Sequence, residues 1–158
     1  DTGHALYSIC RAIKPSCIFE TGTYWGYSTA YLAAAVRDNG AGKVWSFDIY
    51  PHAGRHIPKS LRGYIDLRLG RPSTETMPIV LRGNIPDLVF QDSRHDYEGV
   101  VEELALLEPF LKQNAAILFH DFVEPQVRRA AIEVLKGYRF YTLDLQDPQQ
   151  LGVAIKAD

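Results

Sequence analysis

An acid and two glycines stand close together in residues 18–32, I-F-E-T-G-T-Y-W-G-Y-S-T-A-Y-L. Glycine lets the backbone approach a ligand closely and adopt a positive φ. The helix predicted to follow Gly26 would offer free N–H groups and a partial positive charge. Glu20, where the apolar run ends, would repel a phosphate and attract a cationic group. A tight turn with a solvated acid explains the same residues, so a ligand site and a structural turn both remain open.

The glycine spacing argues against two phosphate-binding motifs. Residues 23–25 separate Gly22 from Gly26, whereas a dinucleotide site needs G-x-G-x-x-G and a P-loop needs Gly-Lys followed by Ser or Thr. Asp48 ends the run K-V-W-S-F-D, twenty-two residues after Gly26. An acid there can accept hydrogen bonds from ribose hydroxyls, although a loop or helix-capping role is also open. The glycine turn and Asp48 together indicate an adenosine-containing ligand with a cationic tail.

A second group of polar residues follows two later apolar runs. D-S-R-H-D-Y begins at Asp92 and contains His95, and I-L-F-H-D ends in His120 and Asp121. Histidine has a pKa near neutrality and is the commonest base for removing a proton from a hydroxyl, so we expect His95 to be that base. A divalent ion can do the same. Alternatively, residues 92–97 only brace the start of a helix.

Short apolar runs alternate with amphipathic ones along the chain, which predicts a mostly parallel sheet with helices on both faces. This is a Rossmann-like, doubly wound α/β fold of seven strands. The last two strands have no helix between them, so we expect an antiparallel hairpin whose turn carries Asp147-Pro148. The predicted strands are 17–20, 43–48, 64–69, 87–91, 115–119, 138–145 and 151–156. The predicted helices are 5–13, 28–37, 73–81, 98–111 and 125–136. Ligands of such sheets bind at the carboxyl ends of the strands, where all the candidate residues fall.

Size and charge limit the class of protein. A chain of 158 residues with a formal net charge of −2 predicts one domain, residues 1–158, with no nucleic-acid footprint. No apolar run approaches the ~18 residues of a membrane span. Cys10 and Cys17 are expected to be buried thiols rather than a disulfide, which favours a reducing, cytoplasmic location. The chain begins at Asp1 without methionine, so N-terminal elements could be missing.

The motifs resemble those of a known family. E-T-G-T-Y-W-G-Y-S followed by F-D-I-Y resembles the cofactor site of class I S-adenosylmethionine-dependent methyltransferases. The stretches D-L-V-F-Q-D-S-R-H-D-Y-E-G-V-V-E-E-L, L-L-E-P-F-L-K and I-L-F-H-D are similar to a compact group within that family, which includes small-molecule and sugar O-methyltransferases. The resemblance extends over nearly the whole chain.

The resemblance implies roles for individual residues. Glu20 would lie near the ammonium of the methionine part, Asp48 would hold the ribose, and Gly70 would border the adenine. The full set of implied cofactor-binding residues is Glu20, Gly22, Thr23, Gly26, Ser28, Asp48, Ile49, Gly70, Asp92 and Ser93. Two residues depart from the pattern. Arg71 stands where many relatives have an acid near adenine, and Arg94 stands at a usually small or acidic position, from which we expect it to point at the substrate.

The resemblance also implies a metal in some relatives. They bind Mg²⁺ through an acid at the Asp92 position and acids at the end of the next strand, where only Asp121 is acidic here because His120 replaces the other. Oxygen-rich Mg²⁺ sites tolerate imidazole badly. We therefore expect His95, His120 and Asp121 to be the catalytic residues, with Mg²⁺ on Asp92 and Asp121 as an alternative.

The implied function is methyl transfer from S-adenosylmethionine to a hydroxyl of a small molecule. Two other classes remain open, namely a binding module with the same fold and no turnover and another adenosine-cofactor enzyme, such as an NAD-dependent oxidoreductase. The sequence identifies neither the acceptor nor the oligomeric state.

Overall fold

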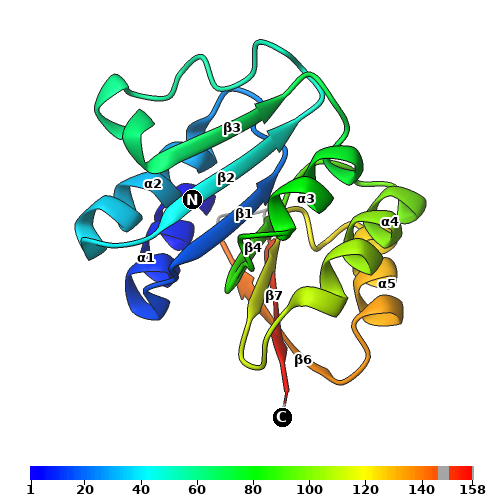
Figure 1. Ribbon diagram of the computed structural model, residues 1–158. Helices are drawn as coiled ribbons and strands as arrows, with labels where there is room; N and C mark the ends of the chain where they lie inside the picture. Colours follow the sequence, from blue (N-terminus) through cyan, green and yellow to red (C-terminus); the bar gives the residue numbers. More distant parts are fainter. Residues whose placement is uncertain (146–149, 158) are drawn as a thin grey trace.

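The computed structural model of the protein describes residues 1–145 and 150–157, and within them the strands form one sheet (Figure 1). Its order is β3-β2-β1-β4-β5-β7-β6. The strands are β1 (Cys17–Thr21), β2 (Lys43–Asp48), β3 (Ile65–Leu69), β4 (Leu88–Gln91), β5 (Ala116–Phe119), β6 (Tyr138–Asp144) and β7 (Gln150–Lys156). The predicted Asp147-Pro148 turn lies outside the described residues.

The five strands from β1 to β5 run parallel, and β7 lies antiparallel between β5 and β6. The predicted doubly wound sheet with an antiparallel C-terminal hairpin is therefore confirmed. What the sequence did not predict is that the second strand of the hairpin, and not the first, pairs with β5. Ala116 faces Ile155 in that pairing, and Tyr138 faces Lys156 in the hairpin.

Helices cover both faces of the sheet (Figure 1). Helices α1 (Thr2–Ile13) and α2 (Tyr27–Asn39) lie on one face, and α3 (Ser73–Leu81), α4 (Tyr97–Leu107) and α5 (Pro125–Val134) lie on the other. Two 3₁₀ segments, η1 (Lys59–Tyr64) and η2 (Glu108–Phe110), complete the described elements. No helix in the described part of the chain is both long and apolar enough to cross a membrane.

The long helix predicted over residues 98–111 is shorter in the structure. Helix α4 ends at Leu107 and continues as η2, with Pro109 in its first turn. Proline has no N–H to donate and its ring clashes with the carbonyl four residues back, so it ends this helix. Pro78, by contrast, is accommodated inside α3.

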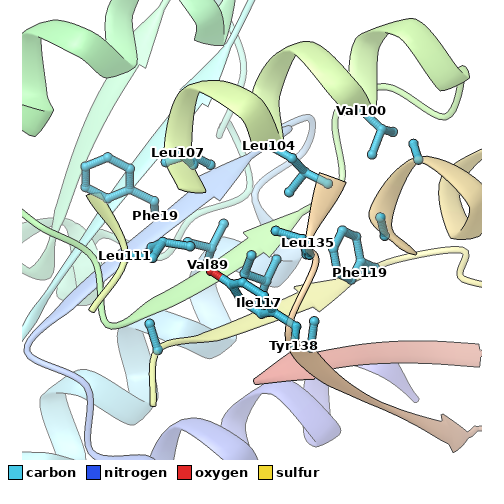
Figure 2. Close-up of a cluster of buried hydrophobic side chains, with 14 of the residues drawn as sticks. Phe19, Val89, Val100, Leu104, Leu107, Leu111, Ile117, Phe119, Leu135 and Tyr138 are labelled. Carbon is cyan, nitrogen blue, oxygen red and sulfur yellow. The ribbon is translucent and has the colours of Figure 1, made fainter. Parts of the chain in front are cut away.

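The hydrophobic core has two parts, one on each face of the sheet. Figure 2 shows the larger part, where Leu104 and Leu107 of α4 lie over Phe19 of β1 and Val89 of β4. Strands β4 and β5 are buried along their whole length, as central parallel strands covered on both faces are. Both cysteines are free thiols, and burial raises the pKa of Cys10 to about 12. The core thus holds the carboxyl ends of β1, β2, β4 and β5 at one rim.

Candidate functional site

Two cavities lie at the carboxyl ends of the parallel strands. The first cavity has a volume of about 470 Å³ and the second about 500 Å³. Gly22, Tyr24, Asp92 and His120 line both, so the two spaces adjoin. The other residues of the first cavity are 47–50, 72–74, 93–95, Glu103 and Asp121. The other residues of the second cavity are 1–3, 23, 25–28, Tyr31 and Phe90.

The turn between β1 and α2 requires its glycines. Gly22 has a φ of +93°, and a Cβ there would lie 2.1 Å from the carbonyl oxygen of Asp92. Gly26 has a φ of +89°, and its Cβ would lie 2.4 Å from Cγ1 of Ile57. Both values are far inside van der Waals contact, so no other residue fits without displacement of the backbone or of Ile57. The positive φ angles that the sequence allowed for are present, and the close contacts of both glycines are with other parts of the chain.

Asp48 is held in place by the backbone on both sides of the first cavity. Its side chain ends β2, and Asp48 is 8% exposed. The N–H of Tyr24 donates to its Oδ2 at 2.7 Å, and the N–H of Tyr50 donates to its Oδ1 at 2.8 Å. Each carboxylate oxygen can accept a further hydrogen bond. Asp48 is therefore a fixed acceptor at the cavity wall, with the exposed side chain of Ile49 beside it.

Glu20 lies beneath the turn and lines neither cavity. Its side chain is fully buried, so the alternative of a solvated acid is wrong. Hydroxyls of Thr29 and Ser46 donate to its Oε2 at 2.5 and 2.6 Å, while its Oε1 has no partner. Burial raises the pKa of Glu20 to about 7, against the opposing effect of the neighbouring hydroxyls of Ser28, Ser46 and Thr29. Ser28, which acts on this carboxylate, lines the second cavity.

Two further predicted cofactor residues are Thr23, on this turn, and Gly70, after β3. Thr23 lines the second cavity, with its hydroxyl 2.6 Å from that of Ser46. Gly70 lines neither cavity, and its N–H donates to the carbonyl of Asp48 at 2.9 Å. Residues 72–74, immediately after it, take the place at the wall. Arg71 is exposed and pairs with Glu75 at 3.7 Å, which leaves the cavity wall without its charge.

Four titratable side chains converge where the two cavities meet. Asp92 and His95 follow β4, His120 and Asp121 follow β5, and one ligand atom from each lies within 4.8 Å of the others. Nδ1 of His120 is 3.1 Å from Oδ1 of Asp92 and 3.0 Å from Oδ2 of Asp121. Nε2 of His95 is 3.5 Å from the same two oxygens. Asp121 has a φ of +49°, uncommon for a residue other than glycine. The sequence-predicted catalytic residues are thus brought together.

The carboxylates of this cluster favour the protonated imidazoles. The side chain of Asp92, followed by Asp121, raises the pKa of His120 to about 9, and Asp92 also raises the pKa of His95. Partial burial opposes both shifts. The contacts of His120 Nδ1 have ion-pair distances but not the direction of hydrogen bonds. The two carboxylates therefore favour the charged form of both imidazoles, and each histidine becomes a base only at a higher pH than is usual for histidine.

The same cluster does not fit Mg²⁺ well. Asp92 and Asp121, the predicted metal ligands, do lie close together, but two of the four converging donors are imidazole nitrogens. Mg²⁺ requires a nearly all-oxygen octahedron, whereas mixed nitrogen and oxygen donors suit ions such as Zn²⁺.

The sequence did not single out Glu103, which lines the first cavity although it is 1% exposed. The sequence did contain a signal for it. Glu103 falls between Val100 and Leu104 on the buried stripe of α4, where an apolar residue is expected. Arg94, expected to point at the substrate, lines the first cavity and also pairs with Asp96 and Glu102 at 2.8 and 3.2 Å. Both of these acids belong to α4, as its N-cap and as a residue of the helix.

Comparisons with known proteins identify the family and the fold. A family model described as a methyltransferase domain matches residues 19–122, more than half of the chain. A search of curated proteins finds no match. Among solved structures, cofactor-bound Rv0187 from MTB is similar with a TM-score of 0.79 at 20% identity, over 99% of this chain and 79% of that one. The O-methyltransferase TomG from Streptomyces achromogenes has a TM-score of 0.76 at 18% identity, over 99% and 79%. The O-methyltransferase from Bacillus cereus has a TM-score of 0.76 at 17% identity, over 98% and 80%.

Proposed function

The chain belongs to the methyltransferase-domain family, within the class I S-adenosylmethionine-dependent methyltransferases, and we propose that it methylates a hydroxyl of a small molecule. The observation that carries this proposal is the first cavity, which joins Asp48, a fixed acceptor for ribose, to the four-residue cluster of Asp92, His95, His120 and Asp121. Two similar structures, from Streptomyces achromogenes and Bacillus cereus, are named as O-methyltransferases in complex with S-adenosylmethionine or S-adenosylhomocysteine.

In the proposed reaction the protein positions the acceptor and removes its proton. S-adenosylmethionine, when bound, supplies a methyl group activated by its sulfonium. The acceptor oxygen forms a bond to that methyl carbon as the carbon–sulfur bond breaks, and S-adenosylhomocysteine leaves. His95 takes the proton of the hydroxyl, because it faces the first cavity and is the more exposed histidine of the cluster. Holding both reactants in line supplies much of the remaining acceleration.

Calorimetric titration tests the proposed function. We expect S-adenosylhomocysteine to bind and NAD not to bind, since the glycine turn lacks a pyrophosphate motif and Glu20 lies beneath it. Methyl transfer from S-adenosylmethionine is then measured with a panel of hydroxylated compounds. Binding of NAD alone would indicate an oxidoreductase. Binding of S-adenosylhomocysteine without transfer to any compound of the panel would indicate a non-catalytic module.

Chelation distinguishes proton transfer by histidine from metal catalysis. After dialysis against EDTA, we expect methyl transfer to continue at an unchanged rate, because both carboxylates of the cluster already lie within ion-pair distance of His95 and His120. The rate is measured with a radiolabelled methyl donor before and after dialysis. Loss of activity that Mg²⁺, Mn²⁺ or Zn²⁺ restores would show instead that the cluster holds an ion.

The raised pKa of Glu20 predicts that cofactor affinity depends on pH. A group with a pKa of about 7 in the free protein is half protonated near neutrality. If the ammonium of the bound ligand favours the carboxylate, binding releases a proton, and affinity falls as the pH drops below about 7. We expect S-adenosylhomocysteine to bind about tenfold more weakly near pH 6 than near pH 8.

Two controls separate Glu20 from the other titrating groups nearby, His95, His120 and Asp92. The ligand 5′-methylthioadenosine lacks the amino-acid tail, so its affinity should change little over the same range. In Glu20→Gln the carboxyl no longer titrates, and the dependence should disappear for S-adenosylhomocysteine as well. An equal pH dependence for both ligands would remove Glu20 from the recognition of the tail.

A further inference from the structure

Four polar side chains donate hydrogen bonds to the buried carboxylate of Glu103. Its Oε1 accepts from the hydroxyls of Ser73, at the start of α3, and Ser93, after β4, the second at 2.6 Å. Its Oε2 accepts from Oγ1 of Thr21 at 3.2 Å and from Nε2 of Gln91 at 3.4 Å. Both oxygens of the carboxylate are therefore surrounded by donors, and the proposed function uses none of these five residues for chemistry.

The carboxylate determines which way the two serine hydroxyls point. A hydroxyl has one hydrogen and two lone pairs, whereas a carboxylate can only accept. Because Ser73 and Ser93 donate their hydrogens to Glu103, each has only lone pairs left to offer to the first cavity, which both of them line. This wall, which we call the acceptor wall, can accept a hydrogen bond from a ligand and has no hydroxyl hydrogen to donate.

On the basis of the proposed function, we propose that Glu103 is a specificity-determining residue that selects adenine by its exocyclic amine. The ribose acceptor Asp48 lines the same cavity as the acceptor wall, so a base attached to that ribose shares the cavity with Ser73 and Ser93. An amine donates to the wall. A carbonyl at the same position of the base would set acceptor against acceptor and leave buried polar groups unpaired, which sites of this kind reject strongly.

A conservative variant can reverse the hydrogen-bond direction without removing the side chain. In Glu103→Gln, one side-chain oxygen becomes an NH₂ donor. Gln91 Nε2 also donates to the carbonyl of Arg94 at 2.9 Å, so Gln91 remains a donor and requires an oxygen on its side of residue 103. The new NH₂ then faces Ser73 and Ser93 and donates to them. Their hydrogens become free to point into the cavity, where they can bind a carbonyl.

Calorimetry with two ligands that differ at this one position tests the inference. The ligands are S-adenosylhomocysteine and S-inosylhomocysteine, which carries a carbonyl in place of the amine. We expect the unsubstituted protein to prefer the adenosyl ligand by about tenfold or more, and Glu103→Gln to reduce that preference to about twofold or less. The control is Glu102→Gln, a neighbour on α4 that is exposed and pairs with Arg94, and it should keep the full preference.

The outcomes separate a role in specificity from a role in folding. A merely structural Glu103 would weaken both ligands equally, and an unchanged ratio in Glu103→Gln would overturn the inference. Should that variant not fold, Ser93→Ala removes one acceptor of the wall and should weaken the adenosyl ligand without weakening the inosyl ligand. Equal weakening of both ligands by Ser93→Ala would likewise overturn it. If the unsubstituted protein binds neither ligand, the proposed function fails, and this inference fails with it.

Discussion

Replacement of His95 by alanine should lower the turnover of methyl transfer by about 10²- to 10⁴-fold, the usual contribution of a general base. His95 lies in the first cavity, 3.5 Å from carboxylate oxygens of Asp92 and Asp121. It is not part of the turn or of the Asp48 contacts that would hold the cofactor. Affinity for S-adenosylhomocysteine should therefore change by no more than about twofold, while kcat falls.

The pH profile gives a second measurement of the same role. Because Asp92 raises the pKa of His95, the base form increases as the pH rises above the usual range of histidine, and kcat should increase with it. In His95→Ala this increase of kcat with pH should disappear. His52→Ala, in the loop after β2 and outside the cluster, is the matched control and should keep both rate and profile. Full activity of His95→Ala would make the residue structural and move the proton transfer to His120.

Asp48→Ala should weaken binding of S-adenosylhomocysteine by about 10- to 100-fold, because hydrogen bonds to a charged group contribute roughly 1.5–3 kcal/mol. The carboxylate also holds the backbone of Tyr24 and Tyr50, so part of the loss would come from a less ordered cavity wall. Titration calorimetry gives the affinity, and thermal unfolding shows how much stability is lost. The effect should appear in affinity at a temperature where the variant is fully folded.

Asp66→Ala is the matched control for Asp48→Ala. Asp66 lies on the neighbouring strand β3 and pairs with Arg68 at 2.7 Å, but it lines neither cavity. Asp66→Ala removes a carboxylate from the same region of the sheet, and the affinity for S-adenosylhomocysteine should stay unchanged. If Asp48→Ala and the unsubstituted protein bind S-adenosylhomocysteine equally well, Asp48 only holds the backbone of Tyr24 and Tyr50 and does not bind the ligand.

The fold was largely predictable because its signals are local. Helix α3 and strand β2 have the predicted bounds, since Pro72 and Asp48 mark where each begins or ends. The position of β7 between β5 and β6 could not be predicted, because strand order depends on pairing between distant segments. The end of α4 at Leu107 shows a local signal, Pro109, that the sequence interpretation weighed too lightly.

The site was predictable where residues end a parallel strand. The rule that ligands bind at the carboxyl ends of strands was enough to select Asp48, Asp92 and His120, and the structure places all three at a cavity wall. Glu103 was not predicted because it lies inside a helix and not at the end of a strand. The burial of Glu20 was also not predicted. Whether an acid at a strand end is covered depends on side chains of other elements, here Thr29 of α2 and Ser46 of β2.

The place of β7 in the sheet has a consequence for synthesis on the ribosome. Strand β5, A-I-L-F, is entirely apolar and buried, and β7 covers one of its two pairing sides. A nascent chain emerges N-terminal end first, so β5 is exposed before β7 exists to pair with it. An unpaired apolar strand is a template for association with other chains. Slow translation of the segment after α5 would therefore prolong an aggregation-prone interval, and a chaperone that shields β5 would raise the yield of folded protein.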